Sequence, residues 1–151
     1  MRTVIFLIDE KPAQLSMLRE FFPAQYFLNV YQRGKPAFRA ALQEKPNLIL
    51  LDSQISDIDA HELCRLFKGN QALRKTRIVM LYPQSAAARC KRCYQFGADD
   101  YLLKPLLQHE CSVRLRILLK TPQVSTPESF PFINPEGTGL APFIPITPVM
   151  S

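Results

Sequence analysis

Five short apolar runs alternate with helical patterns along residues 1–120, and this alternation strongly limits the possible folds. Each run holds three to five residues rich in Val, Ile, Leu or aromatic side chains, without strict alternation of polar and apolar positions. Such continuity is typical of parallel strands that are covered by helices on both faces. The five runs are 4–8, 27–30, 48–51, 78–81 and 101–103.

The segments that follow these runs carry apolar residues at the three- and four-residue spacing of helices. Pro36 falls in a first turn, Pro46 follows the second helix and Gly97 ends the fourth. A strand–helix unit repeated five times implies right-handed crossovers, and therefore a doubly wound α/β fold with a parallel sheet. The apolar stripes comprise Leu15, Leu18 and Phe22; Phe38, Ala41 and Leu42; Leu63, Leu66 and Phe67; Ala86, Cys90 and Cys93; and Leu107, Cys111, Leu115 and Leu118.

The composition changes after Lys120. Seven of the 13 prolines lie in residues 121–151, which have few charges and no helical or strand periodicity. We therefore predict one domain over residues 1–120 and a Pro-rich tail over 121–151. Two interpretations of the tail remain open. Its dispersed apolar side chains suit an extended docking arm, and its composition equally suits a linker to an output domain.

The bulk composition indicates a globular protein, with 47% hydrophobic and 21% charged residues. No apolar run approaches the ~20 residues that span a bilayer, and no secretory signal is recognisable. We therefore predict a cytoplasmic protein with reduced cysteines. The net charge of +6 is spread over all the predicted helices, which indicates a solvated surface rather than a membrane or nucleic-acid site.

Cysteine and histidine residues, which bind metals in many proteins, also occur along the chain. Cys90 and Cys93 have the spacing of some redox and zinc sites, but both lie on an apolar stripe and no second pair accompanies them. We therefore predict that they are structural. His61 and His109 each stand alone and are predicted to be surface residues rather than ligands.

Charged residues follow three of the predicted strands. The first strand runs into Asp9 and Glu10, the third into Asp52 and the fifth into Lys104. The carboxyl ends of parallel strands form one edge of the sheet, where open α/β folds bind ligands, so these side chains should converge there. Repulsion between the carboxylates calls for a cation, and oxygen ligands favour Mg²⁺. The alternative is that each acid only caps the following helix.

Three segments, VIFLIDEKP, PNLILLDSQISDIDAHEL and FGADDYLLKP, resemble the signature segments of response-regulator receiver domains of two-component signalling. The resemblance covers about residues 2–120 and includes the spacing between the strand-end residues. It implies a flavodoxin-like (βα)₅ sandwich with a five-stranded parallel sheet in the order 2-1-3-4-5.

The resemblance also implies a role for each strand-end residue. Asp52 matches the aspartate that accepts a phosphoryl group from a histidine kinase, and a carboxylate is a suitable nucleophile. Lys104 matches the lysine that pairs with the phosphoryl oxygens, with a cis bond to Pro105. Tyr101 matches the aromatic residue that changes rotamer on activation. The implied Mg²⁺ ligands are Asp9, Glu10, Asp52 and the backbone carbonyl of Gln54.

Four positions depart from the family pattern. Tyr82 and Pro83 replace a Thr or Ser and a small residue that normally bind the phosphoryl group through a hydroxyl and a backbone N–H. Tyr82 nevertheless occupies the position whose side chain, in this family, shifts on activation, which we call the switch position. Ser56 replaces the usual proline, and Ala60 replaces a glycine, which predicts strain or a rebuilt loop if that position needs positive φ.

Two functions remain open at this stage. The first is a receiver, not a classical enzyme, that is phosphorylated on Asp52 and binds a histidine kinase or phosphotransfer protein and a downstream partner or output domain. Its signalling face would comprise the helix around residues 86–93, the strand 101–103 and the helix around 107–118, and this face would also suit a homodimer. The second is a pseudo-receiver that acts as a phosphorylation-independent interaction module.

Overall fold

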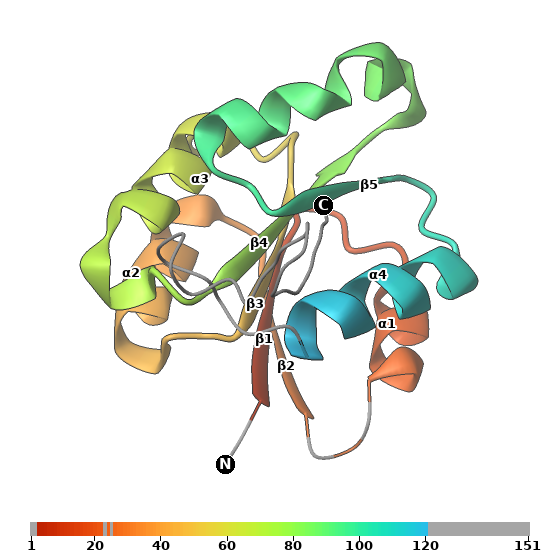
Figure 1. The fold of residues 1–151 in the computed structure, drawn as a ribbon, viewed down its shortest axis with the longest axis horizontal. Coiled ribbons are helices and arrows are strands. Elements are labelled where there is room, and N and C mark those ends of the chain that lie inside the picture. The colour runs from red at the N-terminus through yellow and green to blue at the C-terminus, as the bar shows by residue number, and fades with distance from the viewer. Residues whose placement is uncertain (1–2, 23, 25, 121–151) are drawn as a thin grey trace, which may run out of the picture. The chain divides into compact units, whose positions relative to one another are not determined.

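The computed structural model describes residues 3–120 apart from 23 and 25, so the predicted tail at 121–151 lies outside the described residues. Within the described chain, five strands form one parallel sheet in the order β2-β1-β3-β4-β5 (Figure 1). This confirms the predicted doubly wound fold. The strands are β1 (Thr3–Ile8), β2 (Tyr26–Tyr31), β3 (Leu48–Asp52), β4 (Arg77–Tyr82) and β5 (Asp100–Leu103).

Each strand contains the apolar run that predicted it. Residues 4–8 of β1 and all of β3 are buried, as expected of central strands with helices on both faces. β3 pairs with β4 in a register that sets Asp52 opposite Leu81. β2 lies at the edge of the sheet, and its Phe27 is 43% exposed. The prediction that every strand is fully covered is therefore wrong for β2.

Helices cover the two faces of the sheet in separate sets (Figure 1). α1 (Leu15–Phe21) and α4 (Gln108–Lys120) contribute Leu18 and Leu115 to one core layer. The other layer receives side chains from α2 (Gly34–Glu44), α3 (Ala60–Gly69), the short helix η1 (Gln71–Leu73) and the long 3₁₀ helix η2 (Gln84–Phe96). In the described part of the chain, no helix has the length and apolar character needed to cross a membrane.

The fourth predicted helix is the main correction to the secondary structure, because η2 is a 3₁₀ helix rather than an α-helix. Its predicted inward side chains, Ala86, Cys90 and Cys93, are nevertheless buried. The four cysteines of the described chain are free thiols, and burial raises the pKa of Cys93 to about 12. These features agree with the predicted structural role of the CxxC pair.

Two leucines of the predicted stripes are exposed, so their assignment to the core was wrong. Leu107 precedes the first residue of α4 and is 62% exposed. Leu66 lies on the outward edge of α3, because Leu63 and Phe67 already fill the face that contacts the sheet.

The loop between β3 and α3 has no backbone strain at Ala60. Ala60 is the first residue of α3, and among the described non-glycine residues the positive φ belongs to Lys45. Asp59 caps α3 by accepting a hydrogen bond from the His61 N–H at 3.1 Å. Asp57, from the same loop, accepts hydrogen bonds from the first two backbone N–H groups of α2, those of residues 34 and 35, at 2.8 and 2.9 Å.

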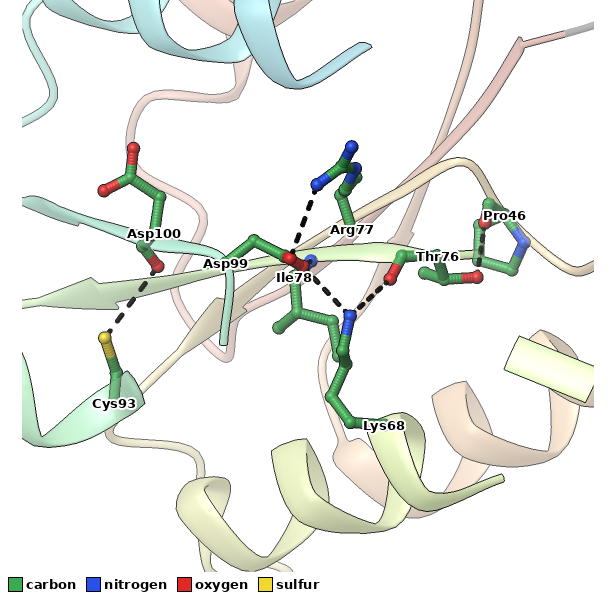
Figure 2. A network of polar contacts seen from close by, with 8 residues as sticks. All are labelled: Pro46, Lys68, Thr76, Arg77, Ile78, Cys93, Asp99 and Asp100. Carbon is green, nitrogen blue, oxygen red and sulfur yellow. Dashed lines mark hydrogen bonds and ion pairs between the residues drawn. The ribbon is translucent and has the colours of Figure 1, made fainter. Parts of the chain in front are cut away.

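An ion-pair network joins the segment between η2 and β5 to β4 and α3 (Figure 2). Gly97 ends η2 with a left-handed φ of 96°, which turns the chain toward β5. The carboxylate of Asp99 then accepts hydrogen bonds from the Ile78 N–H at 2.8 Å and the Lys68 ammonium at 3.1 Å. The Arg77 guanidinium lies 3.6 Å from the same carboxylate. These contacts fix the N-terminal end of β4, at the opposite end of that strand from Tyr82.

Candidate functional site

The carboxyl edge of the sheet holds a hollow of about 330 Å³. Its lining residues come from the ends of three strands, so the structure brings together the charged side chains that the sequence placed at strand ends. The lining residues are Asp9, Glu10, Lys11, Asp52, Gln54 and Lys104.

Lys104 bridges two of these carboxylates. Its ammonium group lies 2.6 Å from Oδ2 of Asp9 and 3.1 Å from Oδ1 of Asp52. Burial alone would lower the pKa of Lys104, but the hydrogen bond to Asp9 and the charge of Asp52 outweigh burial and raise it. Lys104 therefore remains a cation over the physiological pH range. The bond from Lys104 to Pro105 is cis, as the family resemblance implied.

Asp52 is a buried acid and accepts fewer hydrogen bonds than Asp9 or Glu10. It is 5% exposed, and burial together with the charge of Asp9 raises its pKa despite the opposing charge of Lys104. Oδ2 accepts one hydrogen bond from the Gln54 N–H at 3.3 Å. The buried Oδ1 accepts no hydrogen bond from any described residue, although the Lys104 ammonium lies near it. Oδ1 of Asp52 is therefore contacted by a cation but accepts no hydrogen bond from the described residues.

Glu10 is held by the residue that replaces the usual proline. The backbone N–H of Ser56 donates to Oε2 of Glu10 at 2.7 Å, and the Ser56 hydroxyl donates to the same oxygen. These hydrogen bonds lower the pKa of Glu10. A proline could provide neither donor. Glu10 thus lines the hollow but has a competing partner outside the predicted metal-ligand set.

The oxygen atoms that line this hollow are only partly suited to binding a hard divalent cation. Asp9 and Asp52 offer carboxylate oxygens, and the buried Oδ1 of Asp52 lacks a hydrogen-bond donor. However, in the part of the chain that the structure describes, no three Asp, Glu, His or Cys side chains are grouped closely enough to hold a metal. The engagement of Glu10 with Ser56 is consistent with this. We therefore propose that Asp9 and Asp52 are the main ligands of a bound Mg²⁺. Glu10 and the Gln54 carbonyl would be further ligands.

Replacing Ser56 is expected to change Mg²⁺ affinity because it releases Glu10. Ser56→Ala removes the hydroxyl donor and should tighten Mg²⁺ binding by about threefold, since one hydrogen bond is typically worth about 1 kcal/mol or less. Ser56→Pro removes both donors and should tighten it by about tenfold. Isothermal titration with Mg²⁺ measures both values, and Ser16→Ala on α1 is the control. An unchanged or weaker affinity in both variants would show that Ser56 does not compete with the cation.

Tyr82 at the end of β4 points away from the Asp52 hollow. Its side chain does not line that hollow and is only 4% exposed. Its hydroxyl shares a 2.8 Å hydrogen bond with Nε2 of His61 on α3. The switch position therefore presents no hydroxyl to Asp52, and the ring leaves the Asp52 hollow open. His61 was predicted to be a surface residue, but it is a half-buried partner of Tyr82, so that prediction was wrong.

Tyr101 lies beside Tyr82 and is half-buried. The two ring centroids are 6.5 Å apart in an edge-to-face arrangement, and the ring centroid of Tyr94 lies 6.1 Å from that of Tyr101. The Arg114 guanidinium lies 5.7 Å from the Tyr101 ring centroid. The two positions that the family resemblance assigned to switching are thus in one aromatic cluster.

Gln14 is a site residue that no sequence signal indicated. Its side-chain amide donates to the carbonyl of Leu106 at 2.7 Å and accepts from the Leu106 N–H. These two hydrogen bonds join the start of α1 to the segment that carries Lys104. A lone glutamine 92 residues away from its partner has no recognisable pattern in a single sequence.

Comparisons with known proteins agree with this fold. The family model of the response regulator receiver domain matches residues 5–116. The transcriptional regulatory protein GltR of Pseudomonas aeruginosa is 31% identical over 120 residues, which are 79% of this chain and 50% of that protein. The response regulator ArlR of Staphylococcus saprophyticus is 29% identical over 120 residues, 80% of this chain and 53% of its own length. This chain therefore spans about half the length of both relatives.

Solved structures show the same fold. The receiver domain of a sensor histidine kinase from Pseudomonas aeruginosa, with a magnesium ion coordinated in its active-site cleft, superposes with a TM-score of 0.69. The match has 23% sequence identity and covers 80% of this chain and 100% of that one. The chain belongs to the response regulator receiver domain family, whose members are signalling domains of two-component systems and not classical enzymes.

Proposed function

We propose that this chain accepts a phosphoryl group on Asp52 in a Mg²⁺-dependent reaction and passes the signal on through protein contacts. The observation that carries the proposal is the buried Oδ1 of Asp52, which forms a 3.1 Å ion pair with the Lys104 ammonium and accepts no hydrogen bond from the described residues. A nucleophilic oxygen beside a fixed cation at the carboxyl edge of the sheet is the arrangement that phosphoryl transfer needs.

In the proposed reaction, an oxygen of Asp52 attacks the phosphorus of a phosphohistidine or a small phosphodonor. The new O–P bond forms as the bond to the donor breaks, and the leaving group takes that electron pair. The Lys104 ammonium pairs with a phosphoryl oxygen, and Asp9 keeps the ammonium in place. Mg²⁺, held by Asp9, Asp52, Glu10 and the Gln54 carbonyl, would neutralise further charge on the transferred group.

The proposed partners follow from this role. A histidine kinase or phosphotransfer protein would supply the phosphoryl group, and a downstream protein or an output domain would read the result. The reading face would comprise η2, β5 and α4, and the same face would serve a homodimer. Exposed Tyr94, Val113 and Ile117 on these elements are the apolar side chains available for that contact.

Phosphorylation can be tested directly on the full chain. Incubation with acetyl phosphate and Mg²⁺ should raise the intact mass by one phosphoryl group, and Asp52→Asn should abolish the increase because an amide is not a nucleophile of this kind. An ordinary receiver domain treated in parallel is the positive control. If the control is labelled and this chain is not, the proposal fails.

Asp52→Asn is also expected to stabilise the fold at neutral pH. The pKa of Asp52 is raised in the folded state, so its ionisation opposes folding once the pH exceeds the unfolded value of about 3.9. The variant should therefore have a free energy of unfolding about 1 kcal/mol higher at pH 7, with the gain shrinking toward pH 4. Urea unfolding at both pH values measures this. A gain that is equal at pH 4 and pH 7 would contradict the raised pKa.

A second function, a pseudo-receiver that acts without phosphorylation, is favoured by one observation. The Tyr82 hydroxyl is engaged by His61 and Pro83 has no N–H, so two donors that normally bind the phosphoryl group are missing. In that case Asp52→Ala should leave the affinity for a partner unchanged. Partner binding that requires both Mg²⁺ and acetyl phosphate would exclude this alternative.

A further inference from the structure

A second hollow, of about 190 Å³, lies between the end of β4, α3 and the first turns of η2. It shares Gln54 with the hollow that contains Asp52, and its other lining residues differ from those of that hollow. The receiver chemistry proposed above uses none of its other side chains. Those that matter here are His61, Tyr82, Ser85, Arg89 and Arg92.

The lining of this hollow carries positive charge and no negative charge. Arg89 and Arg92 are three residues apart on η2, and side chains at that spacing eclipse each other on a 3₁₀ helix, so both reach the hollow from the same side. No Asp or Glu is among its lining residues. In the described chain neither arginine has an ion pair or a hydrogen bond, whereas Arg65 and Arg114 both pair with acids. Two neighbouring cations without a counter-charge favour an anionic ligand.

The inner wall of the hollow is polar and fixed. The Tyr82 hydroxyl and Nε2 of His61 share a 2.8 Å hydrogen bond, and Tyr82 is almost fully buried. The His61 ring also packs against Phe96, with the ring centroids 4.8 Å apart. These contacts hold both side chains in one position before any ligand arrives, which lowers the entropic cost of binding. The Ser85 hydroxyl adds a further donor near the entrance.

We propose that this hollow binds a small phosphate-bearing molecule, with Arg89 and Arg92 pairing with its phosphate oxygens. Two guanidinium groups, a hydroxyl and an imidazole–phenol pair offer more donors than the two oxygens of a carboxylate can accept. A phosphate dianion has three charged oxygens, and guanidinium groups bind these in a forked geometry. Its proposed contact with Tyr82, at the switch position, would let such a ligand act on the signalling face without phosphorylation of Asp52.

The test is a titration of the ¹⁵N-labelled full chain with inorganic phosphate and, separately, with glycerol 3-phosphate, followed by backbone amide shifts. Neutral glycerol is the control ligand. We expect saturable shifts at Ser85, Arg89 and Arg92 with both phosphates and none with glycerol. The Asp52→Asn variant should bind with unchanged affinity, which separates this site from the phosphoryl-acceptor site and from the proposed function.

Variants that replace an arginine with glutamine test whether these two side chains bind the phosphate. Arg89→Gln and Arg92→Gln should each weaken phosphate binding by about tenfold, because each removes a charge-assisted contact. The double variant Arg39→Gln, Arg74→Gln removes two positive charges elsewhere, one more than either single variant, and should have little effect. Shifts that do not saturate, that are weakened equally by the control variant, or that disappear in Asp52→Asn would each overturn the proposal. Tighter binding of glycerol 3-phosphate than of inorganic phosphate would indicate that the rest of the molecule is also recognised.

Discussion

Replacing Asp99 with alanine is expected to lower the free energy of unfolding by about 3 kcal/mol. The change leaves the Lys68 ammonium and the Ile78 N–H without their shared acceptor and removes the carboxylate 3.6 Å from Arg77 (Figure 2). Removing one partner of a buried ion pair typically costs about 3–5 kcal/mol. The lower end applies here because the Lys68 and Asp99 side chains keep 18% and 15% exposure. Urea unfolding at pH 7 measures the loss.

Two further variants test the cause of that loss. Asp99→Asn keeps an oxygen acceptor for the Ile78 N–H but removes the charge, so its loss should be smaller, at about 2 kcal/mol. Glu62→Ala breaks the exposed 3.2 Å pair with Arg65 and should cost less than about 0.5 kcal/mol. If Asp99→Ala is no more destabilising than Glu62→Ala, the network does not stabilise the fold as described.

Replacing Lys104 with methionine is expected to slow phosphorylation of Asp52 by about 100-fold or more. The ammonium is the cation within 3.1 Å of the acceptor carboxylate, and removal of one charge-stabilising donor from an active site typically costs that factor. The rate of mass increase with acetyl phosphate and Mg²⁺ measures the change. Lys75→Met, at an exposed lysine, is the matched control and should not alter the rate.

The same variant should make the free energy of unfolding depend more steeply on pH. Lys104 opposes the burial and the Asp9 charge that raise the pKa of Asp52, so without Lys104 that pKa should rise further. Stability should then fall as the pH rises from about 4 to about 7. In the unmodified chain the raised pKa of Lys104 means that its contribution is lost only at alkaline pH. A Lys104→Met variant with the same pH profile as the parent between pH 4 and pH 7 would contradict the bridging role.

The sheet and the location of the site could be predicted from the sequence because both follow from local patterns. Each apolar run became a strand, and the parallel order brought Asp9, Asp52 and Lys104 to one edge. The 3₁₀ form of η2 could not be predicted, because burial of Cys90 and Cys93 at a spacing of three suits an α-helix as well.

The hydrogen-bond partners within the site could not be predicted from the sequence. The pair formed by Tyr82 and His61 joins side chains 21 residues apart on different elements. The contacts of Ser56 with Glu10 and of Gln14 with Leu106 also depend on side-chain orientation in the folded protein. The sequence did show that Tyr82 and Ser56 were unusual, but not where their hydroxyl groups would go.

The placement of the Asp99 network has a consequence for how such a domain can diverge. Asp99 contacts the N-terminal end of β4, whereas Tyr82 and Pro83 follow at the C-terminal end of the same strand. Changes at sites without shared partners usually have additive effects on stability. Substitutions at the site edge can therefore accumulate in a lineage without loosening the contacts that secure the strand. Such a scaffold allows the chemistry at one end to be replaced while the fold is retained.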